Sequence, residues 1–169
     1  PGGIMSRWET LDEAADRILE RDTNITWVYK EQLYTFSAHN RDNRGDVISC
    51  SYYTLVGTQA FLSRIDFTKV ALVPYDQISS STVAYDHANI VQYAYQRLQW
   101  KMEYTNIVRN ILPNKFSLRE LQKVYEIIMN KAFDKRNFRK KILSLGMLNE
   151  TTEFDTTNSK RPAKLYTFS

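Results

Sequence analysis

The chain has 169 residues, a formal net charge of +4 and 43% hydrophobic residues, a composition typical of ordinary globular proteins. Its length allows one sizeable hydrophobic core or two small ones. The single cysteine, Cys50, excludes an internal disulfide and is typical of a reducing cytoplasm. No apolar run approaches the roughly 20 residues of a membrane-spanning helix and no secretory leader is visible, so we expect a cytoplasmic protein without a membrane partner.

The first predicted element is a helix that begins after Thr10. Thr10 and Glu13 have the spacing of a capping box, in which each side chain bonds the backbone N–H of the other residue. The residues that follow place apolar side chains at helical spacing: Leu11, Ala14, Ala15, Ile18 and Leu19. We therefore expect an amphipathic helix directly after the opening loop.

Strand patterns follow this helix. Residues 25–36 and 47–56 are rich in Val, Ile, Thr, Tyr and Phe with partial alternation, which predicts two strands. The polar residues 37–46 between them predict a loop. Residues 69–73 predict a third strand, which stops at Pro74.

A long helix is predicted to begin at Asp86 and to end near Tyr104, and a shorter helical piece follows it. Residues 112–114 then interrupt the pattern, because the residue before a proline disfavours helical backbone. We therefore expect two domains, residues 1–111 and residues 112–169.

The second domain begins with another capping box, made by Ser117 and Glu120. The helix that it opens carries apolar residues on one face: Leu118, Leu121, Val124, Tyr125 and Ile128. Asp134 is expected to cap a second helix over residues 135–143, which stops at Gly146.

The spacing within this second helix separates an apolar face from a basic one. Phe138, Ile142 and Leu145 recur at i, i+4 and i+7, so we expect them to face inward. Strands are predicted to begin at residues 147–148 and to return at residues 163–168. A helix pair with a tight turn, followed by a two-stranded wing, describes a winged helix-turn-helix.

The basic run on the second helix has two interpretations. A charge run is usually a solvated face. This run, however, lies on the second helix of a tight pair, carries Arg and Asn side chains suited to guanine and adenine edges, and precedes a basic wing. We interpret it as a surface for double-stranded operator DNA, bound by a homodimer on a near-palindromic site. The expected DNA-binding residues are Lys135, Arg136, Asn137, Arg139, Lys140, Lys160, Arg161 and Lys164.

The start of the chain resembles the Nudix box, the loop-helix-loop that holds metal and diphosphate in Nudix hydrolases. Gly3, Glu9 and Arg17 match the spacing of that motif. The resemblance implies magnesium-binding glutamates one, four and five residues after the arginine, on one face of the helix.

Those metal-binding positions are occupied by other residues here. One is Ile18, one is Arg21, and only Asp22 is acidic; the glycine expected next is Asn24. A guanidinium repels a divalent cation by several kcal/mol at close range, roughly estimated at intermediate dielectric. We therefore expect no resident metal and no cofactor, with Glu9 and Asp22 as vestiges of the site, and no hydrolysis by the usual metal-activated water.

Segments along nearly the whole chain resemble the Nudix-related transcriptional regulators of the NrtR type. That family joins a Nudix-like effector domain to a C-terminal winged helix. The resembling segments include residues 34–36, 41–47, 84–88, 97–98, 112–113, 116–118, 120–122, 124–126, 134–141 and 161–166. The resemblance implies an α/β (α+β) fold: a truncated Nudix-like mixed sheet, whose first strands would lie upstream of Pro1, then a winged helix. The family's glycine before the Arg-Pro of the wing is Lys160 here.

The same resemblance implies an effector pocket around the first polar loop. Arg41, Asp42 and Arg44 are its candidate residues, because arginines suit a phosphate or a carboxylate through bidentate contacts. A hairpin loop held by Asp42 and Gly45 explains these residues equally well. Trp8 is suited to stack on a sugar or base, and equally to a core or dimer contact.

These patterns predict a transcriptional regulator that binds operator DNA and senses a small metabolite in a catalytically degenerate Nudix domain. By resemblance, the effector is an ADP-ribose-type nucleotide or a sugar. The alternative is an enzyme, an ADP-ribose or sugar-nucleotide pyrophosphatase with an accessory winged-helix domain. A magnesium-dependent pyrophosphatase assay separates the two hypotheses.

Overall fold

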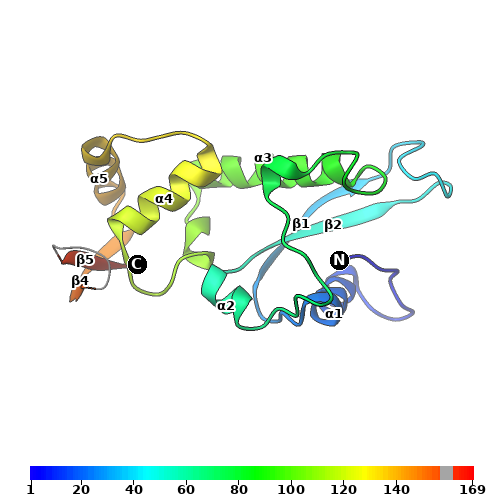
Figure 1. Ribbon diagram of the computed structural model, residues 1–169, viewed down its shortest axis with the longest axis horizontal. Coiled ribbons are helices and arrows are strands. Elements are labelled where there is room, and N and C mark those ends of the chain that lie inside the picture. The colour runs from blue at the N-terminus through cyan, green and yellow to red at the C-terminus, as the bar shows by residue number, and fades with distance from the viewer. Residues whose placement is uncertain (157–161) are drawn as a thin grey trace. The chain divides into compact units, whose positions relative to one another are not determined.

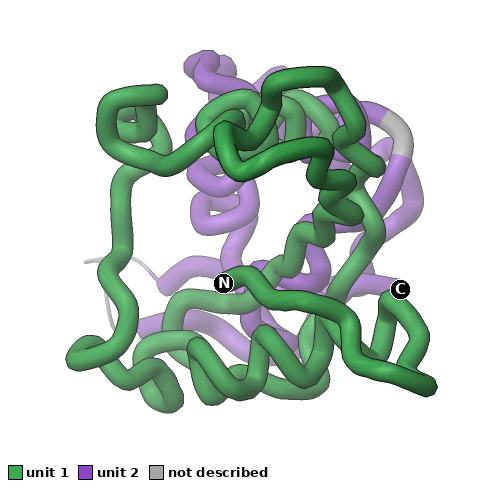
Figure 2. Tube along the Cα trace, turned by 90° about the vertical axis from the view of Figure 1, so that its right-hand side faces the viewer, with its two compact units in different colours: residues 1–97 green, residues 98–169 purple. Residues whose placement is uncertain are grey.

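The structure is a computed structural model that describes residues 1–156 and 162–169. It divides into two compact units, residues 1–97 and residues 98–169, which are coloured separately in Figure 2. A two-stranded antiparallel sheet lies in the first unit and a three-stranded sheet in the second. In the described part of the chain, no helix is both long and apolar enough to cross a membrane.

Helix α1 (Leu11–Thr23) begins where the sequence predicts. The Thr10 hydroxyl accepts a hydrogen bond from the Glu13 backbone N–H at 3.3 Å, and the Glu13 carboxylate accepts one from the Thr10 N–H at 2.7 Å. The helix ends at Asn24, whose φ of 59° is left-handed. Asparagine tolerates that conformation better than most residues, so it replaces a glycine cap at modest cost.

Strands β1 (Tyr29–Phe36) and β2 (Ser49–Leu55) pair antiparallel and form a long ribbon (Figure 1). Both lie within the segments predicted as strands. The register shifts between Gln32 and Tyr34, and the residue between them, Leu33, is buried at 3% exposure. The bulge therefore turns one apolar side chain into the core of the unit.

The third strand predicted at residues 69–73 is wrong. The backbone N–H groups of Lys69 and Val70 both donate to the Asp66 carbonyl, at 3.0 and 3.2 Å, which makes a turn. A strand requires a partner, and no described strand pairs with this segment. Leu72 is consequently 59% exposed. A short helix, α2 (Thr58–Leu62), precedes the segment and a 3₁₀ turn, η1 (Tyr75–Gln77), follows it.

Helix α3 (His87–Tyr104) confirms the predicted long helix and runs from the first unit into the second. The shorter helical piece expected after it is the 3₁₀ helix η2 (Ile107–Asn110). Ile107 and Val108 of this turn are buried at 4% and 0% exposure. They anchor the start of the second unit to its core.

The second unit contains the predicted helix pair and wing. Its strands have the order β3-β5-β4 and pair antiparallel. Phe116, Leu121 and Tyr166 form the centre of its core, each at 1% exposure or less. The two-residue strand β3 was not predicted, because two residues are too short to show alternation. The elements are β3 (Phe116–Ser117), α4 (Leu118–Met129), α5 (Lys135–Ser144), β4 (Leu148–Asp155) and β5 (Ala163–Phe168).

Candidate DNA-binding and effector sites

The turn between α4 and α5 is fixed by side chains of α4. Helix α4 ends at Asn130, which has a left-handed φ of 48°. The Glu126 carboxylate accepts hydrogen bonds from the Phe133 backbone N–H and from Gln122 Nε2, both at 2.9 Å. Gln122 Nε2 also donates to the Phe133 carbonyl at 2.8 Å. The Phe133 N–H lowers the pKa of Glu126, so the ionised carboxylate is the form that holds the turn.

Asp134 caps α5 as predicted. Its carboxylate accepts from the backbone N–H groups of Arg136 and Asn137, at 3.1 and 2.9 Å. Two donors that a helix start leaves unpaired are thereby satisfied, and the negative charge lies at the positive end of the helix dipole. The Asp134 side chain therefore fixes where α5 starts.

The inner face of α5 is apolar at its centre. Phe138 and Ile142 are 8% and 4% exposed, and the Phe138 ring meets the Tyr125 ring edge-on at 5.5 Å. Leu145, expected on the same face, lines an open cavity and stays 51% exposed. Leu145 therefore lies on the predicted inward face with Phe138 and Ile142, but it is not buried there, because no described element covers it.

The outer face of α5 is basic. Arg136, Arg139 and Lys140 are exposed, and successive residues turn by about 100° around a helix, which places these three away from Phe138. Lys135 is also exposed at the first position of the helix. Asn137 is exposed too, but it lines the cavity beside the apolar face. The structure thus brings three of the five predicted α5 residues onto one outward face.

The wing carries one described candidate residue, Lys164 on β5. Its ammonium pairs with the Glu150 carboxylate of β4 at 2.7 Å, and this contact raises the pKa of Lys164 and lowers that of Glu150. Lys164 is therefore charged but already balanced by a neighbour. The other two predicted wing contacts, Lys160 and Arg161, lie outside the described residues.

In the first unit, Arg41 is buried in an ion pair. Its Nη2 and Nε donate to the two carboxylate oxygens of Asp86 at 2.6 and 2.9 Å, and Nη1 donates to the Val47 carbonyl at 3.4 Å. The side chain is 4% exposed. The Nε and Nη2 donors of Arg41 are thus engaged by Asp86, and this ion pair connects the polar loop to the start of α3.

The neighbouring pair, Asp42 and Arg44, holds the polar loop together. The Asp42 carboxylate accepts from the Arg44 backbone N–H at 2.9 Å and from Arg44 Nη2 at 2.6 Å. Hydrogen bonding to the Arg44 side chain lowers the pKa of Asp42 to about 2. The Arg44 guanidinium lies 4.5 Å from the centre of the Tyr85 ring, and its side chain remains 65% exposed.

A hollow of about 740 Å³ lies beside this loop. Its lining comes from the polar loop and from the start of α3: Ala38, His39, Asn40, Arg41, Asn43, Ala84, Tyr85, Asp86 and Asn89. Asp42 and Arg44 are not on the lining, although Arg44 contacts Tyr85, which is. Trp8 is not on the lining either, and it is 97% exposed with a left-handed φ of 68°.

The vestigial Nudix box is held together by its own side chains. Arg17 donates to both oxygens of the Glu9 carboxylate, which lowers the pKa of Glu9 to about 2, and to the Ile4 carbonyl at 3.1 Å. Arg21 pairs with Asp22 and donates to the Gly2 carbonyl at 2.9 Å. Among the described residues, no three His, Cys, Asp or Glu side chains group as metal ligands.

Comparisons with known proteins agree with this geometry. The pattern of the NrtR DNA-binding winged helix domain matches residues 108–168. The chain is 32% identical to the ADPR responsive transcriptional repressor NtrR of Acinetobacter baylyi, over 99% of this chain and 68% of that protein. It resembles the crystal structure of Shewanella oneidensis NrtR complexed with a 27mer DNA, with 30% identity, a TM-score of 0.84, and coverage of 100% of this chain and 78% of that one.

The Nudix-like part is likewise supported. A MutT/nudix family protein from Enterococcus faecalis matches with 25% identity and a TM-score of 0.75, over 100% of this chain and 73% of that chain. The fold and the sites therefore define a two-part protein, a Nudix-like unit joined to a winged-helix DNA-binding domain. The chain belongs to the NrtR family.

Sequence reasoning did not find two features of these sites. It did not pair Arg41 with Asp86, which lies 45 positions away, nor did it place Tyr85 beneath Arg44. The only available signal was that both partners lie in the segment 84–88 that resembles the family. Pattern alone does not say which residues of two distant segments meet.

Proposed function

We propose that the chain is a transcriptional regulator whose winged helix, residues 112–169, binds operator DNA under the control of a small metabolite. The observation that carries the proposal is the outward face of α5. Arg136, Arg139 and Lys140 extend from one side of a helix whose opposite side is buried by Phe138 and Ile142. The relatives' names support it, since one is described as a repressor and another was crystallised with DNA.

The test is an anisotropy titration with duplex from the protein's own promoter and with a random duplex of equal length. We expect Arg136→Ala or Arg139→Ala to cost about 1–3 kcal/mol of specific affinity if the side chain contacts a guanine. Lys140→Ala should weaken all sequences alike and lower the salt slope by about 1. Lys141→Ala, which removes the same charge on the cavity side, is the matched control. Equal binding to promoter and random duplex contradicts the proposal.

We further propose that two copies bind one near-palindromic operator, because winged helix-turn-helix proteins read symmetric half-sites as dimers. Light scattering on the free protein and the stoichiometry at saturating DNA measure this directly. A complex with one chain per duplex at all concentrations contradicts it.

The proposed effector is an anionic nucleotide of the ADP-ribose type, bound beside the polar loop. Arg44 supports this, because its guanidinium is 65% exposed and lies over Tyr85, next to the 740 Å³ hollow. Both arginines pair with a carboxylate of the protein, Arg41 with Asp86 and Arg44 with Asp42, but the Arg41 side chain is only 4% exposed. We therefore propose that Arg41 positions the loop and leaves the ligand contact to the exposed Arg44. The relative's description as ADPR responsive points to the same ligand class.

A true effector should shift operator affinity by about 5- to 150-fold, which is the usual size of coupling between two sites. ADP-ribose, NAD and common sugars are first screened by thermal shift, and each hit is then added to the DNA titration. Arg44→Ala should abolish the shift while Arg64→Ala, an exposed arginine elsewhere in the unit, should preserve it. A ligand that stabilises the protein without changing operator affinity contradicts a sensor role.

A further inference from the structure

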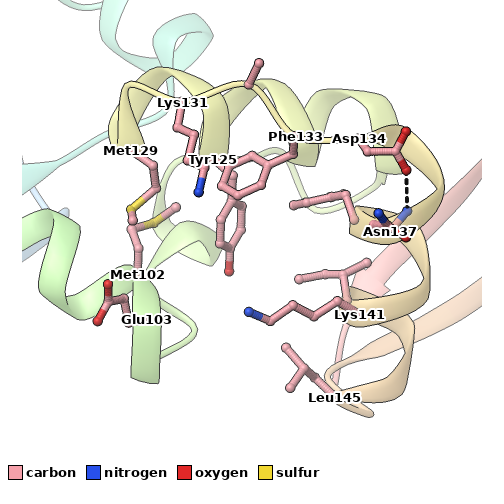
Figure 3. A pocket seen from close by; sticks show the side chains of 13 residues that line it. Met102, Glu103, Tyr125, Met129, Lys131, Phe133, Asp134, Asn137, Lys141 and Leu145 are labelled. Atoms are coloured by element: carbon pink, nitrogen blue, oxygen red, sulfur yellow. Dashed lines mark hydrogen bonds between the residues drawn. The ribbon is translucent and has the colours of Figure 1, made fainter.

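A cavity of about 660 Å³ lies entirely within the second unit, between the end of α3, the end of α4, the turn after it and the inner side of α5 (Figure 3). Its volume falls in the range of small-molecule sites, about 300–1,000 Å³. The 740 Å³ hollow beside the polar loop, proposed above for the effector, is lined by residues of the first unit, so this cavity belongs to a different part of the chain. Its lining is Met102, Glu103, Tyr125, Met129, Lys131, Ala132, Phe133, Asp134, Asn137, Phe138, Lys141, Ile142 and Leu145.

The walls of this cavity are mostly apolar and adaptable. Met102 on α3 and Met129 on α4 bring thioethers to one side, and unbranched methionines accommodate ligands of irregular shape (Figure 3). The opposite side is formed by Phe138 and Ile142 of α5, with the Phe133 ring 5.9 Å from that of Phe138. Such walls favour an apolar ligand body of aliphatic chain or aromatic ring.

The polar groups that point into the same space are mainly hydrogen-bond donors. The ammonium groups of Lys131 and Lys141 extend into the cavity from different elements, and the Tyr125 hydroxyl points there too (Figure 3). Among the described residues, neither lysine has a carboxylate partner and the hydroxyl has no hydrogen-bond partner. Burial raises the pKa of Tyr125, so its hydroxyl stays protonated and able to donate.

The two carboxylates on the lining leave these donors available. Asp134 is engaged in capping α5, as described above. Glu103 lies on α3, at the edge of the cavity away from α5 (Figure 3). The cavity thus combines apolar walls with two positive charges and one hydroxyl donor, which is complementary to a molecule with an apolar body and one acidic head.

We propose that this cavity is a binding site for an amphipathic carboxylic acid, either a medium-chain acyl acid or an arylalkanoic acid. The carboxylate lies between Lys131 and Lys141 with the Tyr125 hydroxyl donating to it, and the hydrocarbon body lies between Met129 and Phe138. Charge-assisted hydrogen bonds fix the head, and burial of hydrocarbon supplies most of the affinity. The site is separate from the nucleotide effector site and does not depend on the proposed DNA binding.

The test is isothermal titration of the full chain with sodium octanoate and, as a second probe, 4-phenylbutyrate. Octanamide has the same hydrocarbon body without the charge and should bind at least tenfold more weakly. The double substitution Lys131→Glu with Lys141→Glu should weaken octanoate at least tenfold and should create binding of octylamine. Arg119→Glu with Lys123→Glu is the matched control: it reverses two charges at exposed positions of α4 outside the cavity lining and should leave octanoate affinity unchanged.

Both substituted lysines are exposed, so the variants should keep the circular dichroism and unfolding midpoint of the parent chain. The proposal is overturned if octanoate does not bind at millimolar concentration, or if octanamide binds equally well. It is also overturned if the double charge reversal leaves octanoate affinity unchanged. If octanoate affinity falls as protein concentration rises, a second copy of the chain covers the cavity, and the acid is not its occupant.

Discussion

Replacing Arg41 with alanine should destabilise the protein far more than an ordinary surface arginine does. The guanidinium is 4% exposed, and its partner carboxylate on Asp86 is 15% exposed, so neither charge is well solvated. The pair is bidentate, at 2.6 and 2.9 Å, and a third donor bonds the Val47 carbonyl at 3.4 Å. Removing the arginine would leave Asp86 with a poorly hydrated negative charge.

The magnitude follows from the burial of this pair. Breaking a buried ion pair by removing one partner costs about 3–5 kcal/mol, whereas an exposed pair contributes about 0–1 kcal/mol. A domain has roughly 5–15 kcal/mol of stability in total, so this loss is a large share of it. Lys69→Ala is the control, because Lys69 and Asp66 are paired at 3.6 Å with side chains 67% and 42% exposed.

Urea unfolding followed by circular dichroism measures the difference for Arg41→Ala, and for Arg41→Met, Asp86→Leu and the double variant that combines these last two substitutions. The double variant should cost much less than the sum of the single substitutions, because it leaves no unpaired charge. If Arg41→Ala costs no more than Lys69→Ala, or if the double variant equals the sum, the pair is not the connection between the polar loop and α3 that we describe.

Three further predictions concern other parts of the chain. The hydrogen bond from Arg17 lowers the pKa of Glu9 from 4.5 to about 2, so the stability that the ionised Glu9 contributes is present above pH 4.5 and is lost as the pH falls toward 2. In the Glu9→Gln variant, the thermal midpoint should therefore change less with pH between 4.5 and 2 than in the parent chain. An equal pH dependence in the two proteins would refute this linkage. Ser117→Ala removes the α4 cap and should cost about 1 kcal/mol in urea unfolding, whereas Ser144→Ala should be nearly neutral. The double substitution Ile18→Glu with Arg21→Glu would place three carboxylates, with Asp22, on one face of α1. Mg²⁺ should then raise the thermal midpoint of this variant but not that of the parent chain. At 100 times the dissociation constant, bound Mg²⁺ should add about 2.7 kcal/mol to the free energy of unfolding.

The helix starts could be predicted because their determinants are local. Each of these helix starts depends on residues within four positions of one another. Hydrogen bonds confirm all three: Thr10 with Glu13, Ser117 with Glu120, and Asp134 with the backbone of Arg136 and Asn137. The winged helix was predicted on the same local basis, whereas the family prediction rests on segments that resemble its members. Local chemistry of this kind does not depend on knowing the rest of the chain.

The remaining features depend on distant partners. Residues 69–73 have the composition of a strand, but pairing decides strands, and no described strand lies beside them. Leu145 follows the helical period, but burial requires something to pack against it, and the space before it is a cavity. The sequence leaves Arg41 open between an effector contact and a loop-holding role, because its position in the chain does not reveal Asp86, which accepts its hydrogen bonds.

The vestigial Nudix box shows how a motif can lose its metal ligands and keep its loop. A Cβ added at Gly3 would lie 3.0 Å from Ile18 Cδ1. The Ile18 side chain therefore packs directly against the loop backbone at Gly3, where there is no side chain in the way. Arg21 donates to the Gly2 carbonyl from the next turn of the same face, and Asn24 supplies the left-handed helix end. Each replaced position therefore has a structural contact that requires no ion. The guanidinium of Arg21 also pairs with both oxygens of Asp22, so the acid that remains at the metal positions is neutralised by a neighbouring side chain. The Arg21→Glu substitution would therefore remove both the partner of Asp22 and the hydrogen bond to the Gly2 carbonyl, so a restored metal site would have to replace these contacts in holding the loop.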